Sequence, residues 1–186
     1  DYVDRNKDFI SNIPFLSKVL KTTSNVNSVI EFGCNIGLNL KLFRLLLPKC
    51  QLTGVEINQK ACEELEKWGG AKVIKDSIFN YEENIKYDIS MVKGVLIHID
   101  PNMLNIVYEK LYKSSKRYIL IAEYYSPSPV SIDYRGHNDK LFKRDFAGEM
   151  LDKYENLELL DYGFLYHRDK HFFQDDVSWF LLEKRI

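Results

Sequence analysis

Short apolar segments alternate with amphipathic helical patterns along this 186-residue chain, and this alternation limits the fold more than any other feature. Continuous apolar character is typical of strands that are buried on both faces of a sheet. A strand, a helix and a second strand form a right-handed crossover, which produces a parallel sheet with helices on both faces. We therefore expect one α/β domain over residues 1–186.

The pattern predicts seven strands and five helical segments. Strands are expected at 28–32, 51–57, 71–76, 87–96 and 117–125. Helices are expected within 1–23 with a break near Pro14, at 37–47, from an Asn58 cap to Gly69-Gly70, after an Asp100-Pro101 cap, and near 144–153. Residues 157–168 and 176–185 are predicted to form an antiparallel hairpin. The result is a mostly parallel, Rossmann-like sheet of seven strands.

Composition argues against several classes of protein. The formal net charge of −1 argues against a nucleic-acid partner. Cys34, Cys50 and Cys62 show neither a CxxC pair nor a Cys/His cluster, so we expect free thiols in a reducing cytosol and no metal site. No apolar stretch approaches the ~20 residues of a membrane span, and we see no signal-peptide pattern. A cytoplasmic protein without a membrane span is therefore expected.

The segment Ile30–Gly37 reads IEFGCNIG and joins the first predicted strand to its helix. Gly33 and Gly37 allow a ligand to approach the backbone at this turn. A GxGxxG spacing would favour a nicotinamide oxidoreductase, but the chain lacks one. Glu31 precedes the first glycine, and a carboxylate there repels phosphate and suits a cationic or hydroxyl-rich ligand. The alternative is a turn that serves only strand–helix packing.

Further acidic residues end the next two predicted strands. Glu56 ends the second strand, where a carboxylate can accept hydrogen bonds from both ribose hydroxyls. Asp76 and Ser77 end the third strand, where the edge of an adenine would lie. Because the carboxyl ends of parallel strands meet at one edge of the sheet, these residues predict a nucleoside site there.

These positions resemble the class I S-adenosylmethionine-dependent methyltransferases. Their first motif is E/D-x-G-x-G-x-G. This chain matches it at Glu31, Gly33 and Gly37 but has Asn35 in place of the middle glycine. The resemblance implies S-adenosyl-L-methionine as cofactor and S-adenosyl-L-homocysteine as product. It also implies a cofactor site made of Glu31, Gly33, Asn35, Gly37, Glu56, Ile57, Asp76, Ser77, Lys93 and Gly94.

The methyl acceptor is expected at the loops after the fourth and fifth strands. His98 follows the fourth strand and suits a base or an acceptor-orienting group, although a helix-cap or core role is the alternative. Residues 123–150 are polar, aromatic and long, which predicts a functional loop rather than a solvated flap. Its candidate acceptor-binding residues are Tyr124, Tyr134, Arg135, Lys143 and Arg144, and Tyr125 and His137 join His98 as candidate bases. Arg144 and Asp145 could instead pair and cap the next helix.

Three longer stretches carry a more specific resemblance, namely KGVLIHIDP, AEYYSPSPVSIDYRGHNDKLFKRDFAGEM and DYGFLYHRD with DDVSWFLLEK. They are similar to the pseudaminic acid biosynthesis-associated methylases of bacterial surface-glycan and capsule gene clusters. This resemblance implies O-methylation of a small anionic sugar or phosphoramidate precursor. Tyr2 and Arg5 resemble the family's N-terminal Tyr-x-x-Arg-Asn segment and join the candidate acceptor site.

Two alternatives remain open at this point. A non-catalytic cofactor-binding partner of the same pathway would bind S-adenosylmethionine without turnover. A methyltransferase of the same fold could act on protein or nucleic acid. An Asn/Asp-Pro-Pro-Tyr/Phe motif would favour a nucleic-acid base amine, but KGVLIH occupies that place. The sequence does not indicate an oligomeric state.

Overall fold

The computed structural model describes residues 10–82, 84–134 and 137–185, with the backbone alone described at 133, 134 and 137–140. The main sheet consists of β1 (Ser28–Phe32), β2 (Gln51–Glu56), β3 (Lys72–Lys75), β4 (Tyr87–Lys93), β5 (Ser115–Glu123), β8 (Leu157–Leu165) and β9 (Val177–Lys184). Their order is β3-β2-β1-β4-β5-β9-β8. Strands β1 to β5 are parallel, and β9 is antiparallel to β5 and β8. The predicted α/β sheet with a terminal antiparallel hairpin is thus confirmed.

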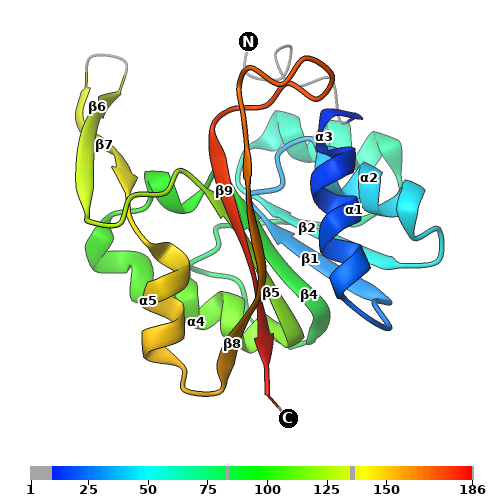
Figure 1. The fold of residues 1–186 in the computed structure, drawn as a ribbon. Helices are drawn as coiled ribbons and strands as arrows, with labels where there is room; N and C mark the ends of the chain where they lie inside the picture. Colours follow the sequence, from blue (N-terminus) through cyan, green and yellow to red (C-terminus); the bar gives the residue numbers. More distant parts are fainter. Residues whose placement is uncertain (1–9, 83, 135–136, 186) are drawn as a thin grey trace.

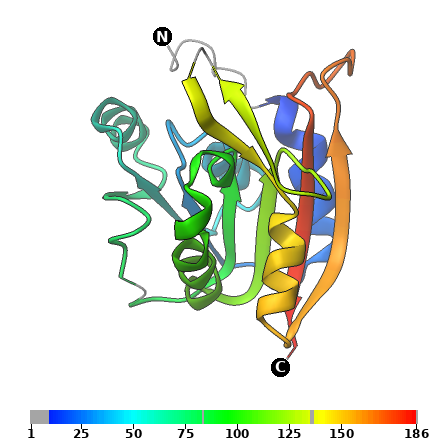
Figure 2. The ribbon, with the colours of Figure 1, turned by 90° about the vertical axis from the view of Figure 1, so that its left-hand side faces the viewer.

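Helices cover both faces of this sheet (Figures 1 and 2). They are α1 (Ile13–Thr22), α2 (Leu38–Leu46), α3 (Gln59–Trp68), α4 (Leu104–Ser114) and α5 (Phe146–Lys153), with 3-10 turns η1 (Ile10–Asn12), η2 (Leu96–His98) and η3 (Pro101–Met103). Helices α1, α2 and α3 pack on one face through Phe15, Phe43 and Leu65. Helices α4 and α5 pack on the other face through Val107 and Met150.

Local sequence signals explain where several elements begin and end. All five residues of β1 are buried, as expected for an interior strand. The Asn58 side chain caps α3 by accepting a hydrogen bond from the Ala61 N–H at 3.1 Å. Gly69 ends that helix in the left-handed conformation with φ 69°. The Asp100 side chain caps η3 through the Asn102 N–H at 2.9 Å.

Several predicted boundaries were wrong for physical reasons. Pro14 does not break the first helix: it lies in the first turn of α1, where its missing N–H costs no hydrogen bond. The fourth strand ends at Lys93 rather than residue 96, because Gly94 turns the chain with φ 67° and η2 follows. The fifth strand spans Ser115–Glu123 and so begins and ends two residues early.

The described residues within 123–150 contain more regular secondary structure than the predicted loop. They contain β6 (Val130–Tyr134) and β7 (His137–Lys143), which form an antiparallel hairpin, followed by α5. Leu141 of β7 is 5% exposed and belongs to the core of the α4–α5 face. Strand β7 also contacts η2. The hairpin is thus anchored beside the segment that follows β4 (Figure 2).

We expect Asp145→Ala to lower the free energy of unfolding by about 1 kcal/mol. The Asp145 carboxylate accepts a hydrogen bond from the Gly148 N–H at 2.8 Å and so caps α5. Urea denaturation measures the loss. Asp152→Ala is the matched control, because Asp152 is exposed in the last turn of the same helix and caps nothing there. Equal stability of the two variants would contradict the capping role.

Candidate functional site at the carboxyl edge of the sheet

The turn after β1 has an unusual backbone. Gly33, Asn35 and Gly37 all have positive φ, at 67°, 49° and 73°. Asparagine is one of the few residues other than glycine that adopts this left-handed conformation readily. The one departure from the glycine motif therefore keeps the backbone that a third glycine would allow.

The two glycines of this turn are also required by packing. A Cβ atom on Gly33 would lie 2.4 Å from Cγ2 of Val95, and one on Gly37 would lie 2.4 Å from Cδ1 of Leu65. The turn therefore packs tightly against the segment after β4 and against α3. This finding supports the packing role that the sequence left open, and the same close packing shapes the edge where a ligand would bind.

Glu31 is a buried carboxyl group beside this turn. It is 2% exposed, and its Oε1 accepts a hydrogen bond from Asn39 Nδ2 at 2.6 Å. Burial raises the pKa of Glu31 to about 7, although the Asn39 hydrogen bond and the nearby Lys93 lower it. Its Oε2 atom is buried without a hydrogen-bond partner among the described residues. A ligand with a cationic donor would satisfy this group.

Glu56 at the end of β2 connects two backbone segments. One carboxylate oxygen accepts from the Asn35 N–H at 2.8 Å, and the other accepts from the Asn58 N–H at 2.7 Å. Each oxygen has a second lone pair, so the group can still accept bonds from a diol. The next residue, Ile57, is 71% exposed, which leaves an apolar surface beside the carboxylate.

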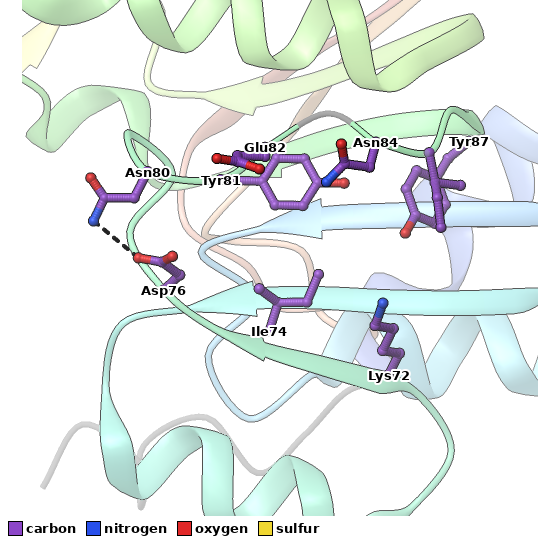
Figure 3. A pocket seen from close by; sticks show the side chains of 9 residues that line it. Lys72, Ile74, Asp76, Asn80, Tyr81, Glu82, Asn84 and Tyr87 are labelled. Carbon is purple, nitrogen blue, oxygen red and sulfur yellow. Dashed lines mark hydrogen bonds between the residues drawn. The ribbon is translucent and has the colours of Figure 1, made fainter.

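Asp76 and Ser77 lie where β3 ends. Asp76 Oδ1 accepts from the Ser77 N–H at 2.7 Å and from Asn80 Nδ2 at 3.1 Å. Residues 76–82 and 84–86 form turns and coil rather than a helix, which leaves the face of β3 partly uncovered. The result is a groove of about 430 Å³. It is lined from Asp76 past Ile74 and Tyr81 to Lys72 and Tyr87 (Figure 3).

Lys93 and Gly94 follow at the end of β4. The Lys93 side chain is largely buried, and its Nζ donates to Gln174 Oε1 at 3.3 Å. A Cβ on Gly94 would meet no atom within 4 Å, so its surroundings are open. The ten cofactor-site residues that the sequence predicted thus lie at or just after the carboxyl ends of β1, β2, β3 and β4, at one edge of the sheet. The cofactor role of each of these residues stays a prediction.

The sequence reasoning missed Glu123, the last residue of β5. It is 2% exposed, and its Oε1 accepts from the N–H groups of Val95 and Leu96, both at 2.9 Å. Burial raises the pKa of Glu123 to about 7, against the lowering effect of these backbone bonds and of Lys93. The sequence did contain a signal for Glu123, because it is an acidic residue at the end of a continuous apolar strand, as Glu31 is near the end of β1.

The predicted acceptor residues are only partly brought together. Tyr125 is 42% exposed and lies with its ring centroid 5.8 Å from that of Phe180. Lys143 Nζ lies 5.3 Å from the ring centroid of Tyr124. His98 is exposed at the end of η2. These residues border the strand ends that carry Lys93 and Glu123, and their roles stay predictions.

Other acceptor candidates have different surroundings. Arg144 pairs with Glu149 at 2.6 Å, and Glu149 also accepts from the Tyr108 hydroxyl at 2.8 Å. Arg144 therefore does not pair with Asp145, which caps α5 by itself. Tyr134 of β6 and His137 of β7 are partners in the backbone register of the hairpin. Tyr2, Arg5 and Arg135 lie outside the described residues.

Cysteines and metal ligands add nothing to this site within the described ranges. Cys34, Cys50 and Cys62 are buried and free, as expected, and burial raises the pKa of all three thiols. No group of three or more His, Cys, Asp or Glu side chains with metal-binding geometry occurs among the described residues. None of the described helices is long and apolar enough to cross a membrane.

The fold is shared with solved methyltransferase structures, whereas no protein-family model and no curated protein matches the chain. The 1,6-didemethyltoxoflavin-N1-methyltransferase of Burkholderia thailandensis, solved with S-adenosylhomocysteine, aligns over 100% of this chain and 84% of its own, with a TM-score of 0.77 and 12% identity. The plantazolicin methyltransferase BpumL aligns over 100% and 88%, with a TM-score of 0.70 and 16% identity. Magnesium protoporphyrin IX methyltransferase of Synechocystis PCC 6803 aligns over 95% and 78%, with a TM-score of 0.66 and 13% identity. The chain thus has the Rossmann-like fold of class I methyltransferases.

We expect the stability of the protein to fall as pH rises from about 5 to about 8. Glu31 and Glu123 have folded pKa values of about 7, above the ordinary 4.5. Protonation of these two carboxyl groups therefore stabilises the fold fully at pH values below their pKa in the unfolded chain. This stabilisation is lost as pH rises through their pKa in the folded protein. Each carboxyl group accounts for up to roughly 3 kcal/mol of this loss in the free energy of unfolding.

Urea denaturation at a series of pH values measures this dependence. Glu123→Gln should remove the part of the pH dependence that Glu123 causes, because the amide carries no charge. The amide also keeps an acceptor oxygen for the two backbone N–H groups. The exposed Glu155→Gln serves as control and should keep the wild-type profile. If the stability of Glu123→Gln fell with pH as steeply as that of the wild type, the raised pKa of Glu123 would not be the cause of the pH dependence.

Proposed function

We propose that this protein is an S-adenosylmethionine-dependent methyltransferase that acts on a small molecule. The observation that carries the proposal is the row of acidic residues at the ends of β1, β2 and β3, namely Glu31, Glu56 and Asp76, beside a turn of three left-handed residues. The fold places ligands at this edge. The names of two structural neighbours state that S-adenosylhomocysteine is bound to them.

Each part of the cofactor has a matching group in this proposal. The diol of the ribose hydrogen-bonds to Glu56, the adenine packs on exposed Ile57, and its edge faces Asp76 and Ser77. The cationic amino group of the methionine part lies toward Glu31. Lys93 and Gly94 face the transferred methyl group. A nucleoside without phosphates suits this edge because its acids would repel a pyrophosphate.

The reaction is an in-line displacement at the sulfonium methyl carbon. An acceptor lone pair forms the new bond, the carbon–sulfur pair returns to sulfur, and the acceptor proton passes to a base or to water. Alignment and exclusion of water supply most of the acceleration. His98, His137 and Tyr125 are the candidate bases.

For the acceptor we propose a hydroxyl of a small anionic sugar or phosphoramidate precursor of a bacterial surface glycan, handled in the cytoplasm. The support is the sequence resemblance together with the aromatic and cationic residues Tyr124, Tyr125 and Lys143 near the strand ends. Aromatic rings suit the apolar face of a sugar, and Lys143 supplies a cation for its anionic group.

We expect Glu56→Ala to weaken binding of both S-adenosylmethionine and S-adenosylhomocysteine by about 100-fold, because hydrogen bonds to a charged group contribute about 1.5–3 kcal/mol. Isothermal titration calorimetry measures both affinities. Glu56→Gln keeps the shape and one acceptor oxygen and should lose less. Glu64→Ala is the control, because Glu64 is an exposed residue of α3. Binding that survives Glu56→Ala unchanged, or a wild type that binds neither ligand, would refute the cofactor assignment.

A thermal-shift screen tests the acceptor. With S-adenosylhomocysteine bound, a panel of nucleotide-sugars and phosphoramidates should contain at least one compound that raises the melting temperature. The same compound should release S-adenosylhomocysteine when incubated with S-adenosylmethionine and enzyme. Methylation of a protein or nucleic acid instead would refute the small-molecule proposal. Cofactor binding without turnover on any acceptor would support the non-catalytic alternative.

A further inference from the structure

Lys93 lies beside the glycine turn because of the strand register. In the parallel pairing of β1 and β4, Glu31 lies opposite Met91 and Phe32 opposite Val92, so the next step places Gly33 beside Lys93. Lys93 also lies two residues beyond Met91 and therefore shares a sheet face with Glu31. A ligand that approaches the Gly33 backbone thus comes close to the Lys93 side chain.

An uncharged amide holds the Lys93 ammonium group. Its Nζ donates to Gln174 Oε1 at 3.3 Å, and Gln174 Nε2 in turn donates to Ser11 Oγ at 2.6 Å. Among the described residues, Lys93 forms no ion pair with a carboxylate. The β8–β9 connection and η1 therefore fix this cation at the strand ends without neutralising it directly.

Three acidic groups act on Lys93 from a longer distance. Burial lowers the pKa of Lys93, and Glu31 of β1, Asp175 of the β8–β9 connection and Glu123 of β5 oppose that shift. Lys93 in return lowers the pKa of both Glu31 and Glu123. The edge thus combines two buried carboxyl groups, which attract a cationic ligand when they are ionised, with one partly buried ammonium group, which repels it.

We propose that the Lys93 ammonium makes this site bind the sulfonium form of its nucleoside cofactor less tightly than it would without that charge, while leaving affinity for the thioether form nearly unchanged. This inference rests on the proposed function. S-adenosylmethionine and S-adenosylhomocysteine differ by one methyl group and one positive charge. Between poorly solvated groups, repulsion of that charge is stronger than in water.

The repulsion would serve the reaction as well as the binding equilibrium. The sulfonium loses its positive charge as the methyl group leaves, so a neighbouring cation destabilises the bound donor more than the transition state. Interactions that differ between ground state and transition state are those that change the rate. Lys93 would thus act as a specificity residue for the charge state of the cofactor.

The test measures the ratio of the Kd for S-adenosylmethionine to the Kd for S-adenosylhomocysteine by calorimetry. We expect Lys93→Gln to lower this ratio about tenfold, because the two ligands share the same amino-acid charges and differ by the sulfonium charge, so the effects on the shared charges cancel in the ratio. Lys93→Arg keeps the charge and should keep the wild-type ratio. Gln174→Glu places a carboxylate beside the ammonium and should lower the ratio in the same direction as Lys93→Gln.

Lys116→Gln is the matched control, because Lys116 carries the same charge at the opposite end of β5 and is exposed. It should leave both affinities unchanged. A wild-type ratio in Lys93→Gln, with S-adenosylhomocysteine still bound, overturns the inference while the cofactor assignment stands. Loss of both ligands in a folded Lys93→Gln protein overturns it too, since it makes Lys93 an attractive contact. Failure of the wild type to bind either ligand instead refutes the proposed function.

Discussion

The carboxylate of Glu56 holds the candidate site together before any ligand arrives. It accepts hydrogen bonds from the backbone N–H of Asn35 in the turn after β1 and of Asn58 at the start of α3. Both donors are main-chain groups, so one side chain sets the spacing between the glycine turn and the next helix. Removal of that acceptor would leave two backbone N–H groups without a hydrogen-bond partner. In a partly buried site this lowers the stability of the fold. The geometry of the turn therefore depends on β2 as much as on its own glycines.

A second constraint is the set of ionisable groups on adjacent strands. Lys93 and Glu123 end β4 and β5, Glu31 is the next-to-last residue of β1, and both glutamates are almost completely buried. Burying carboxyl groups with an unpartnered oxygen costs stability, and such groups concentrate at functional sites. Glu123 also accepts two backbone N–H groups from the segment after β4. The same residue therefore fixes the loop that carries His98 and contributes charge to the edge.

The sequence predicted elements well where their cause is local. A continuous apolar run closed by a glycine turn placed β1 correctly at residues 28–32, and the caps at Asn58 and Asp100 follow from side chains that bond within three residues. The roles of Glu123 and Gln174 were missed because their partners lie 28 and 81 residues away. Arg144 was predicted to bind the acceptor, with pairing to Asp145 as the alternative, and the structure instead pairs it with Glu149 of α5. No periodicity in the sequence carries such contacts.

The sequence pattern did not predict the segments that lie outside the main sheet but contact its carboxyl edge. These are η1, the β8–β9 connection and the β6–β7 hairpin. Gln174 of the β8–β9 connection bonds both Lys93 and Ser11 of η1, while β7 contacts η2 beside the same strand ends. These three segments come from both ends and the middle of the chain. They can change without altering the order of strands β1 to β5. In the proposed function, the strand ends bind the nucleoside, and the attached segments determine what can lie next to it.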